Sequence, residues 1–283
     1  MNRNYMKNTN KPFSINLRTK TLVIIAIAAI IIVTVLICSF FIPSQLNTNF
    51  AFANQPPSLQ HLFGTDWMGR DMFARTIKGL SISIGVGTFA AIVSTIMAIV
   101  LGLLSSLNKF TDEIVVGIID LFNSIPHILL IILISIACGG GFYGVIVGVG
   151  LTHWSPLARV LRAEIKKIKA TDYIKLSGEL GKSKWFVATK HIFVLIIPQI
   201  IVGVILMFPH AIMHEAAISF LGFGLPPHQP AIGIILSESM KYLTAGDWWL
   251  AFFPGLLLLL IVLIFDLIGD SVNKLLDPSS AQE

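Results

Sequence analysis

The stretch TLVIIAIAAIIIVTVLICSFFI, residues 21–42, decides the fold class, because no charged side chain interrupts it. A hydrocarbon core about 30 Å thick needs roughly 20 apolar residues per helix, so this stretch predicts a membrane span. It lacks a small-residue cleavage site after Pro43 and is expected to stay as an anchor. Five similar runs follow, at about 80–107, 114–137, 143–160, 192–213 and 250–268. The prediction is an all-α integral membrane protein with six transmembrane helices.

The composition excludes several other classes. Of the residues, 55% are hydrophobic and 12% are charged, about half the charged fraction of a soluble domain. A transmembrane barrel would show short segments of alternating polarity, whereas these runs are apolar on every face. The net charge of +5 comes from basic residues between apolar runs, which indicates membrane orientation and no nucleic-acid partner. Cys38 and Cys138 lie inside apolar runs and imply no disulfide.

The basic residues also predict the orientation in the cell membrane. With both termini cytoplasmic, the inside segments carry sixteen Lys and Arg, nine of them between Arg159 and Lys190, against four outside. Cytoplasmic loops retain Lys and Arg during insertion. A multi-pass plasma-membrane protein with both ends in the cytoplasm is therefore expected.

The long loop between the fourth and fifth runs contains TDYIKLSGEL, residues 171–180. A helix here places Tyr173, Leu176 and Leu180 on one face and charged side chains on another. Such a helix either lies on lipid headgroups or docks onto a cytoplasmic partner. We favour docking.

The ends of this short helix are also predicted. Thr171 or Asp172 can cap its start, and Gly181 suits a left-handed residue after its end. Ser183 can then cap a second helix that leads into the fifth span.

Three further segments carry a family resemblance. They are FGTDWMGRDMFAR at 63–75, EAAISFLGFGLPPHQPAIG at 215–233, and PGLLLLLIVLIFDLIGDSVNKLLDP at 254–278. Together they resemble the C-type permease of ATP-driven dipeptide, oligopeptide and nickel importers. The loop helix resembles the EAA loop of bacterial importer permeases, with Gly181 at its central glycine and Lys175-Leu176-Ser177 where Glu-Ala-Ala is usual.

The resemblance implies an organisation and a set of partners. Residues 1–79 form the N-terminal anchor and external signature segment, 80–270 the permease core with a coupling helix near 171–190, and 271–283 a cytoplasmic tail. The partners are a homologous second permease, two cytoplasmic ATPases, an external substrate-binding protein and the lipid bilayer. The ATPase-coupling residues are expected to be Tyr173, Leu176, Ser177, Glu179, Leu180 and Gly181.

Residues of the pathway or of an outer lid are expected around the broken helices. Asp66 and Asp71 should cap or pair with Arg70 and Arg75 in a short interfacial helix. In the third run, a proline permits a bend. The candidates are Pro126, His210, His214, Glu215, Gly222, Gly224, Pro226 and Pro227.

Histidines are frequent in or near the middle spans. His210 and His214 are one turn apart, a spacing that can hold a transition metal, with His127 and His153 in neighbouring spans. Packing within the core is the favoured interpretation, so no metal site is assigned. A histidine contact to a metal-complex cargo stays open. The zinc-peptidase order is absent, since Ile218 stands four residues after His214.

No catalytic residue or cofactor is expected. The phosphate-loop pattern Gly-x-x-x-x-Gly-Lys-Ser/Thr is absent from the sequence, since Leu176 stands where its first glycine would precede Gly181-Lys182-Ser183, so a separate polypeptide must hydrolyse ATP. The alternative, a secondary transporter driven by an ion gradient, predicts carboxylates near the membrane midplane. Asp120, Asp266 and Asp270 are expected near span ends instead. The cargo of the importer remains open among peptides, nickel and metal chelates.

Overall fold

The computed structural model describes residues 17–43 and 46–276, so the expected ends of both cytoplasmic tails lie outside the described residues. Within those ranges, five helical stretches are long and apolar enough to cross a membrane, and a bent helix pair makes a sixth. The stretches are α1 (Leu17–Phe41), α2 (Met72–Ser105), α5 (Gly141–Gly150) with α6 (Trp154–Ala170), α9 (Phe193–Phe220) and its preceding turns, and α11 (Trp249–Leu276). The bent pair is α3 (Lys109–Ser124) with α4 (His127–Ala137).

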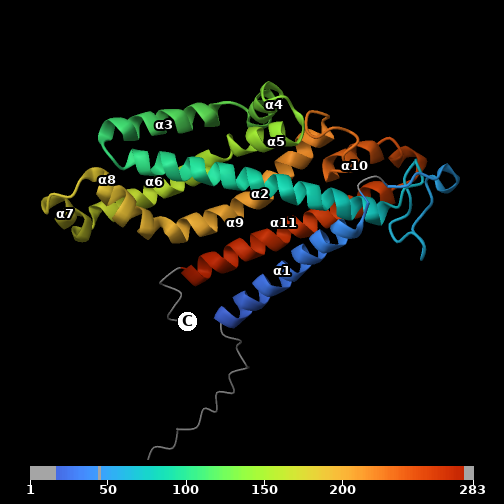
Figure 1. Cartoon of the computed structure of the whole chain (residues 1–283), viewed down its shortest axis with the longest axis horizontal. Coiled ribbons are helices and arrows are strands. Elements are labelled where there is room, and N and C mark those ends of the chain that lie inside the picture. The colour runs from blue at the N-terminus through green and yellow to red at the C-terminus, as the bar shows by residue number, and fades with distance from the viewer. Residues whose placement is uncertain (1–16, 44–45, 277–283) are drawn as a thin grey trace, which may run out of the picture.

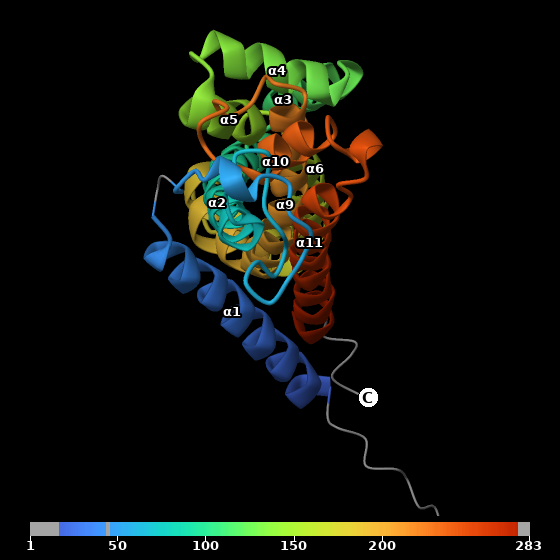
Figure 2. The ribbon, with the colours of Figure 1, turned by 90° about the vertical axis from the view of Figure 1, so that its right-hand side faces the viewer.

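The outer surface of the bundle is apolar, as a membrane requires. On α1, the exposed side chains include Leu22 at 63%, Ile30 at 65% and Phe40 at 85%. This helix lies along one side of the bundle, against α11 and α2 (Figure 2). Water would oppose such exposure, whereas lipid tails are an apolar solvent for it.

Helix α2 is the centre of the bundle and contacts α3, α5, α6, α9, α10 and α11. It begins at Met72, eight residues before the expected start of the span, because the Asp71 carboxylate accepts a hydrogen bond from the Ala74 amide at 2.9 Å. A side-chain cap of this kind satisfies an amide that has no partner within the helix. Close packing of α2 depends on small residues, since a Cβ on Gly87 would lie 2.5 Å from the Ile212 side chain.

The third expected span is two helices. Helices α3 and α4 meet at a bend of 98° across Ile125 and Pro126. Pro126 has no amide hydrogen to donate, and its ring forces the preceding residue out of the helical region. Ile125 accordingly takes an extended conformation with ψ 137°. The bend that the proline permits is therefore present.

The shorter elements gather at the two ends of the molecule (Figure 1). At one end lie α7 (Asp172–Glu179), α8 (Lys184–Phe186) and a π-helical turn (Val187–Ile192) that continues into α9. At the other end lie α10 (Ile232–Ser239), two 3-10 turns (Phe50–Phe52 and Leu243–Ala245) and the loop before α2. One end holds the expected coupling residues and the other the expected lid glycines and prolines, whereas Pro126, His210 and His214 lie between the ends, at the α3–α4 bend and within α9.

Candidate functional site

Helix α7 presents an apolar face away from the protein. Ile174 and Ser177 are buried at 7% and 8% exposure, and Ile174 packs into the core beside α6 and the π-helical turn. Tyr173, Leu176 and Leu180 are 57%, 56% and 72% exposed. The structure thus places the predicted apolar face on the outside and anchors the helix through Ile174, which the prediction did not include.

The end of α7 is a glycine-terminated turn, as predicted. Gly181 has φ +79°, its amide donates to the Gly178 carbonyl at 3.0 Å, and the Lys182 amide donates to the Ser177 carbonyl at 3.3 Å. This pair of bonds is the Schellman motif. The Ser183 hydroxyl caps α8 by accepting from the Phe186 amide at 3.2 Å.

The predicted cap at the start of α7 is wrong. Thr171 stands at the N-cap position, but its hydroxyl donates backward to the Ile168 carbonyl at 2.7 Å and makes no cap bond. Asp172 lies in the first turn, where it bonds Lys175 at 3.2 Å. The Thr171 hydroxyl instead bonds the last turn of α6. Thr171 is thus the single residue between α6 and α7.

Ion pairs brace this end of the bundle. Asp112 of α3 accepts two hydrogen bonds from Arg162 of α6 and lies 3.3 Å from Lys166. Lys169 donates to the Ser106 carbonyl after α2 at 2.7 Å. Because α7 follows α6 directly, any force on α7 passes to a helix that is tied to α2 and α3.

The loop after α9 has the broken backbone expected of a lid. Gly222 has φ +86°, and the Phe223 amide donates to the Ile218 carbonyl at 2.9 Å, so α9 ends in a second Schellman turn. Pro226 opens a tight turn, its carbonyl accepting from the Gln229 amide at 2.9 Å. Pro227 is exposed and lines a pocket of about 420 Å³ with Arg70 and Arg75.

A chain of hydrogen bonds fixes this loop to α9. Glu215 is fully buried and accepts from the Ser219 hydroxyl at 2.8 Å, and that hydroxyl oxygen accepts from the Leu225 amide at 3.2 Å. Gly224 packs directly on the helix, since a Cβ there would lie 2.1 Å from the Ser219 hydroxyl oxygen. A Cβ on Gly233 would lie 2.1 Å from the Ala216 carbonyl oxygen. Glu215 is therefore part of the hydrogen-bonded attachment of this loop to α9.

The segment at 63–75 ties the loop before α2 to α10. Asp66 is 2% exposed and binds Arg70 at 2.7 Å and Arg75 at 3.0 Å, and Arg75 also pairs with Glu238 of α10. The predicted pairing with the arginines and the cap by Asp71 are present. The predicted interfacial helix is wrong, because residues 63–71 form a loop whose left-handed Gly64 and Gly69 break any helix.

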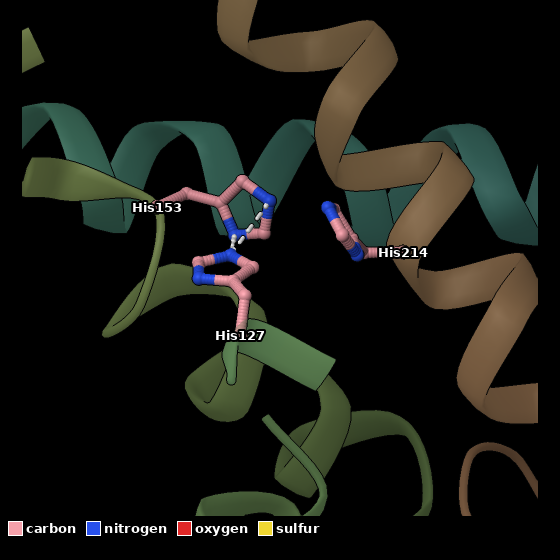
Figure 3. A group of neighbouring side chains, drawn as sticks. All are labelled: His127, His153 and His214. Atoms are coloured by element: carbon pink, nitrogen blue, oxygen red, sulfur yellow. Dashed lines mark hydrogen bonds between the residues drawn. The ribbon is translucent and has the colours of Figure 1, made fainter. Parts of the chain in front are cut away.

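The histidines that lie together are not the pair His210 and His214 that the spacing suggested. His127 at the start of α4, His153 before α6 and His214 on α9 bring nitrogen atoms within 4.8 Å of one another (Figure 3). His210 lies one turn from His214 but is exposed and lines a separate pocket of about 360 Å³ beside Gln199. The bend at Pro126 is what brings His127 to the other two.

Comparison with known proteins agrees with this architecture. Residues 94–281 match the family model described as binding-protein-dependent transport system inner membrane component. The oligopeptide transport system permease protein OppC of Bacillus subtilis is 33% identical over 258 residues, which cover 89% of this chain and 84% of the relative. The glutathione transport system permease protein GsiD of Pectobacterium atrosepticum is 31% identical over 262 residues, covering 90% and 87%.

Solved structures show the same fold at lower identity. Inward-facing conformations of the MetNI methionine ABC transporter match with a TM-score of 0.60 at 17% identity. The match covers 73% of this chain and 98% of that chain.

A bundle of apolar spans that matches this family model and these permease relatives over most of its length is a membrane permease. The chain belongs to the family of binding-protein-dependent transport system inner membrane components, and it is a permease subunit of an ATP-binding cassette importer.

Proposed function

We propose that this chain imports peptides, with a homologous second permease forming the other wall of the pathway. Its relatives include permeases named for oligopeptides, dipeptides and glutathione, all covered over most of their length. In this proposal, two ATPases dock at the end that carries α7, and an external binding protein delivers cargo at the end that carries α10. Nickel or metal-chelate transport has no support from the relatives' names, and the ion-gradient transporter gains none.

The observation that carries the ATPase arrangement is the exposed face of α7. Tyr173, Leu176 and Leu180 form an exposed apolar stripe on a helix that is held to the bundle by the buried Ile174 and Ser177. Their exposure suits insertion into a cleft of a partner protein. The lipid-headgroup interpretation uses the same stripe, so an experiment must separate the two.

Coupling follows from how α7 is attached. Its neighbour α6 is bonded to α3 through Asp112 and to the end of α2 through Lys169. When ATP binding brings the ATPases together, the docked helices move with them, and the braces carry that movement into the spans. ATP acts by changing the relative stability of the inward and outward states.

The decisive experiment compares two neighbouring substitutions on α7. Leu176→Asp puts a charge on the apolar stripe and should abolish co-purification of the ATPase subunits and uptake of peptide. Lys175→Ala, on the charged face, should leave both within about twofold of wild type, as expected for a surface change. ATPase subunits that co-purify with Leu176→Asp at the wild-type ratio would refute docking through this face.

A second experiment tests the orientation. In a background without Cys38 and Cys138, single cysteines at Lys182 and His228 should react with an impermeant thiol reagent from opposite sides of the membrane. Both residues are exposed, and the helices that flank them, α7 with α8 and α9 with α10, place them toward opposite ends of the molecule: α7 and α8 lie at one end and α10 at the other (Figure 1). Equal labelling of both in intact cells would overturn the proposed topology.

The assignment of ATP hydrolysis to other subunits has its own test. Purified chain alone should not hydrolyse ATP, and activity should return when the ATPase subunits are added. Hydrolysis that survives stringent repurification of the chain alone would contradict the proposal.

A further inference from the structure

Three histidines from separate parts of the chain lie together inside the bundle, and the proposed mechanism of peptide import does not use them. His127 lies 3.3 and 3.4 Å from the two ring nitrogens of His153, through its Nε2 atom. His214 meets both rings edge to face, with centroid distances of 5.0 Å to His127 and 4.7 Å to His153. Figure 3 shows the three rings turned toward one shared centre.

The backbone fixes the tautomer of one ring. The Nδ1 atom of His153 lies 2.9 Å from the Val149 carbonyl oxygen. A carbonyl oxygen only accepts, so Nδ1 carries the proton and Nε2 keeps its lone pair. A metal-binding histidine is oriented by the same kind of bond from its other nitrogen to a backbone carbonyl.

The spacing of the nitrogens suits a small cation. Two ligands at 2.0–2.1 Å in a tetrahedron are about 3.3 Å apart. The His127 and His153 nitrogens already lie at 3.4 Å, and all three ligand atoms lie within 4.8 Å of one another. The planes of these two rings differ by 76°, so a ring must turn about its χ2 torsion, which is a soft one.

The chemistry of the donors selects the class of metal. Imidazole suits Zn²⁺, Ni²⁺ and Cu²⁺, whereas Mg²⁺ and Ca²⁺ prefer oxygen ligands. One oxygen of the buried carboxylate of neighbouring Glu215 accepts from the Ser219 hydroxyl. Three protein nitrogens leave at least one coordination position for water or for a ligand that the metal carries.

We propose that His127, His153 and His214 form a binding site for a divalent late transition metal, Zn²⁺ or Ni²⁺, either as the free ion or held in a small chelate. The site joins the start of α4, the turn between α5 and α6, and α9. Bound metal therefore stabilises the conformation in which the bent α3–α4 pair lies against α9, because binding favours the state that has the site. The inference is independent of peptide import.

The test is direct metal binding to the full chain, purified with its partner subunits through a tag without histidine. Co²⁺ is the spectroscopic probe, measured without nucleotide and in a vanadate-trapped state. We expect one Co²⁺ per chain with the visible bands of a low-symmetry site, displaced by Zn²⁺ and not by Mg²⁺. His153→Gln or His214→Gln should weaken binding at least about tenfold, the loss that even an outer-shell change produces.

The matched control is His210→Gln, which changes a histidine one turn away on the same helix and should leave Co²⁺ binding unchanged. Because glutamine within a span could disturb folding, His214→Cys provides a second variant in the background without other cysteines. A thiolate at the metal should add a sulfur-to-cobalt charge-transfer band. Absence of that band in a folded variant that binds Co²⁺ overturns the assignment of His214.

Binding of two forms of nickel to the wild-type complex is then measured: Ni²⁺ alone, and Ni²⁺ bound to iminodiacetate. Binding of Ni²⁺ alone supports a site for the free ion. Binding of the intact complex supports a site for a chelate, since three imidazoles fill the positions that iminodiacetate leaves open on an octahedral ion. Stoichiometric binding in neither nucleotide state, or binding that both His153→Gln and His214→Gln retain at wild-type affinity, overturns the proposal.

Discussion

Alanine at two glycines of the α7 region should act in opposite directions. At Gly178 and at Gly181 an added Cβ meets no atom within 4 Å, so packing does not distinguish them. Only Gly181 has a left-handed backbone, with φ +79°. A side chain there costs about 1–2 kcal/mol, whereas alanine inside a helix gains roughly 0.5–1 kcal/mol over glycine. Gly181→Ala should therefore lower the equilibrium constant for forming the intact turn by about 5–30-fold.

The measurement is the affinity of the ATPase subunits for the permease pair in nanodiscs, with uptake in cells at matched abundance. Gly181→Ala and Gly181→Val should weaken both, because the α7 face is no longer held at its docking angle. Gly181→Asn should stay close to wild type, since asparagine tolerates this conformation. Gly178→Ala should bind as well as wild type or better. Equal losses from the alanine variants at 178 and 181 would refute the reasoning.

The remaining predictions concern the lid and the bent span. Gly224→Ala forces a Cβ to within 2.1 Å of the Ser219 hydroxyl oxygen and should destabilise the lid by about 1–3 kcal/mol. Peptide uptake should fall while ATPase co-purification persists, and wild-type uptake would contradict close packing of the lid. Pro126→Ala should add a straight conformer, in which spin labels at Glu113 and Ile136 move from about 23 Å apart to about 35 Å. An unchanged distance distribution would show that packing alone holds the bend.

Much of the fold could be predicted because each helix that crosses the hydrocarbon core needs a continuous run of about 20 apolar residues, which is visible in the sequence. Every apolar run of sufficient length is helical, although the third is divided between α3 and α4, and the predicted caps at Asp71 and Ser183 are present. Span starts were less accurate, since α2 extends back to its cap through the polar residues Arg75 and Lys78, which the hydrophobic pattern excluded. Apolarity marks the lipid-facing part of a helix and misses the part beyond the hydrocarbon.

The candidate sites show where local reasoning ends. The left-handed Gly181 is a property of one turn and could be read from adjacent residues. The meeting of His127, His153 and His214 could not, because it depends on the direction in which a 98° bend sends α4. Sequence spacing instead favoured His210 with His214, which share a helix. Ile174 was missed because its neighbours on α7 are equally apolar, and apolarity alone does not show which of these side chains the bundle buries.

The two acidic partners of Arg75 have a consequence for how the chain is made. Glu238 lies 163 residues after Arg75, so at synthesis rates of roughly 5–20 residues per second it emerges about 8–33 s later. Asp66 precedes Arg75 by nine residues and is present from the start. The nascent loop can therefore neutralise the arginine locally while the middle spans are inserted. Pairing of α10 with that loop is then a late step of biogenesis, because it requires that the spans between residues 75 and 238 have already been made.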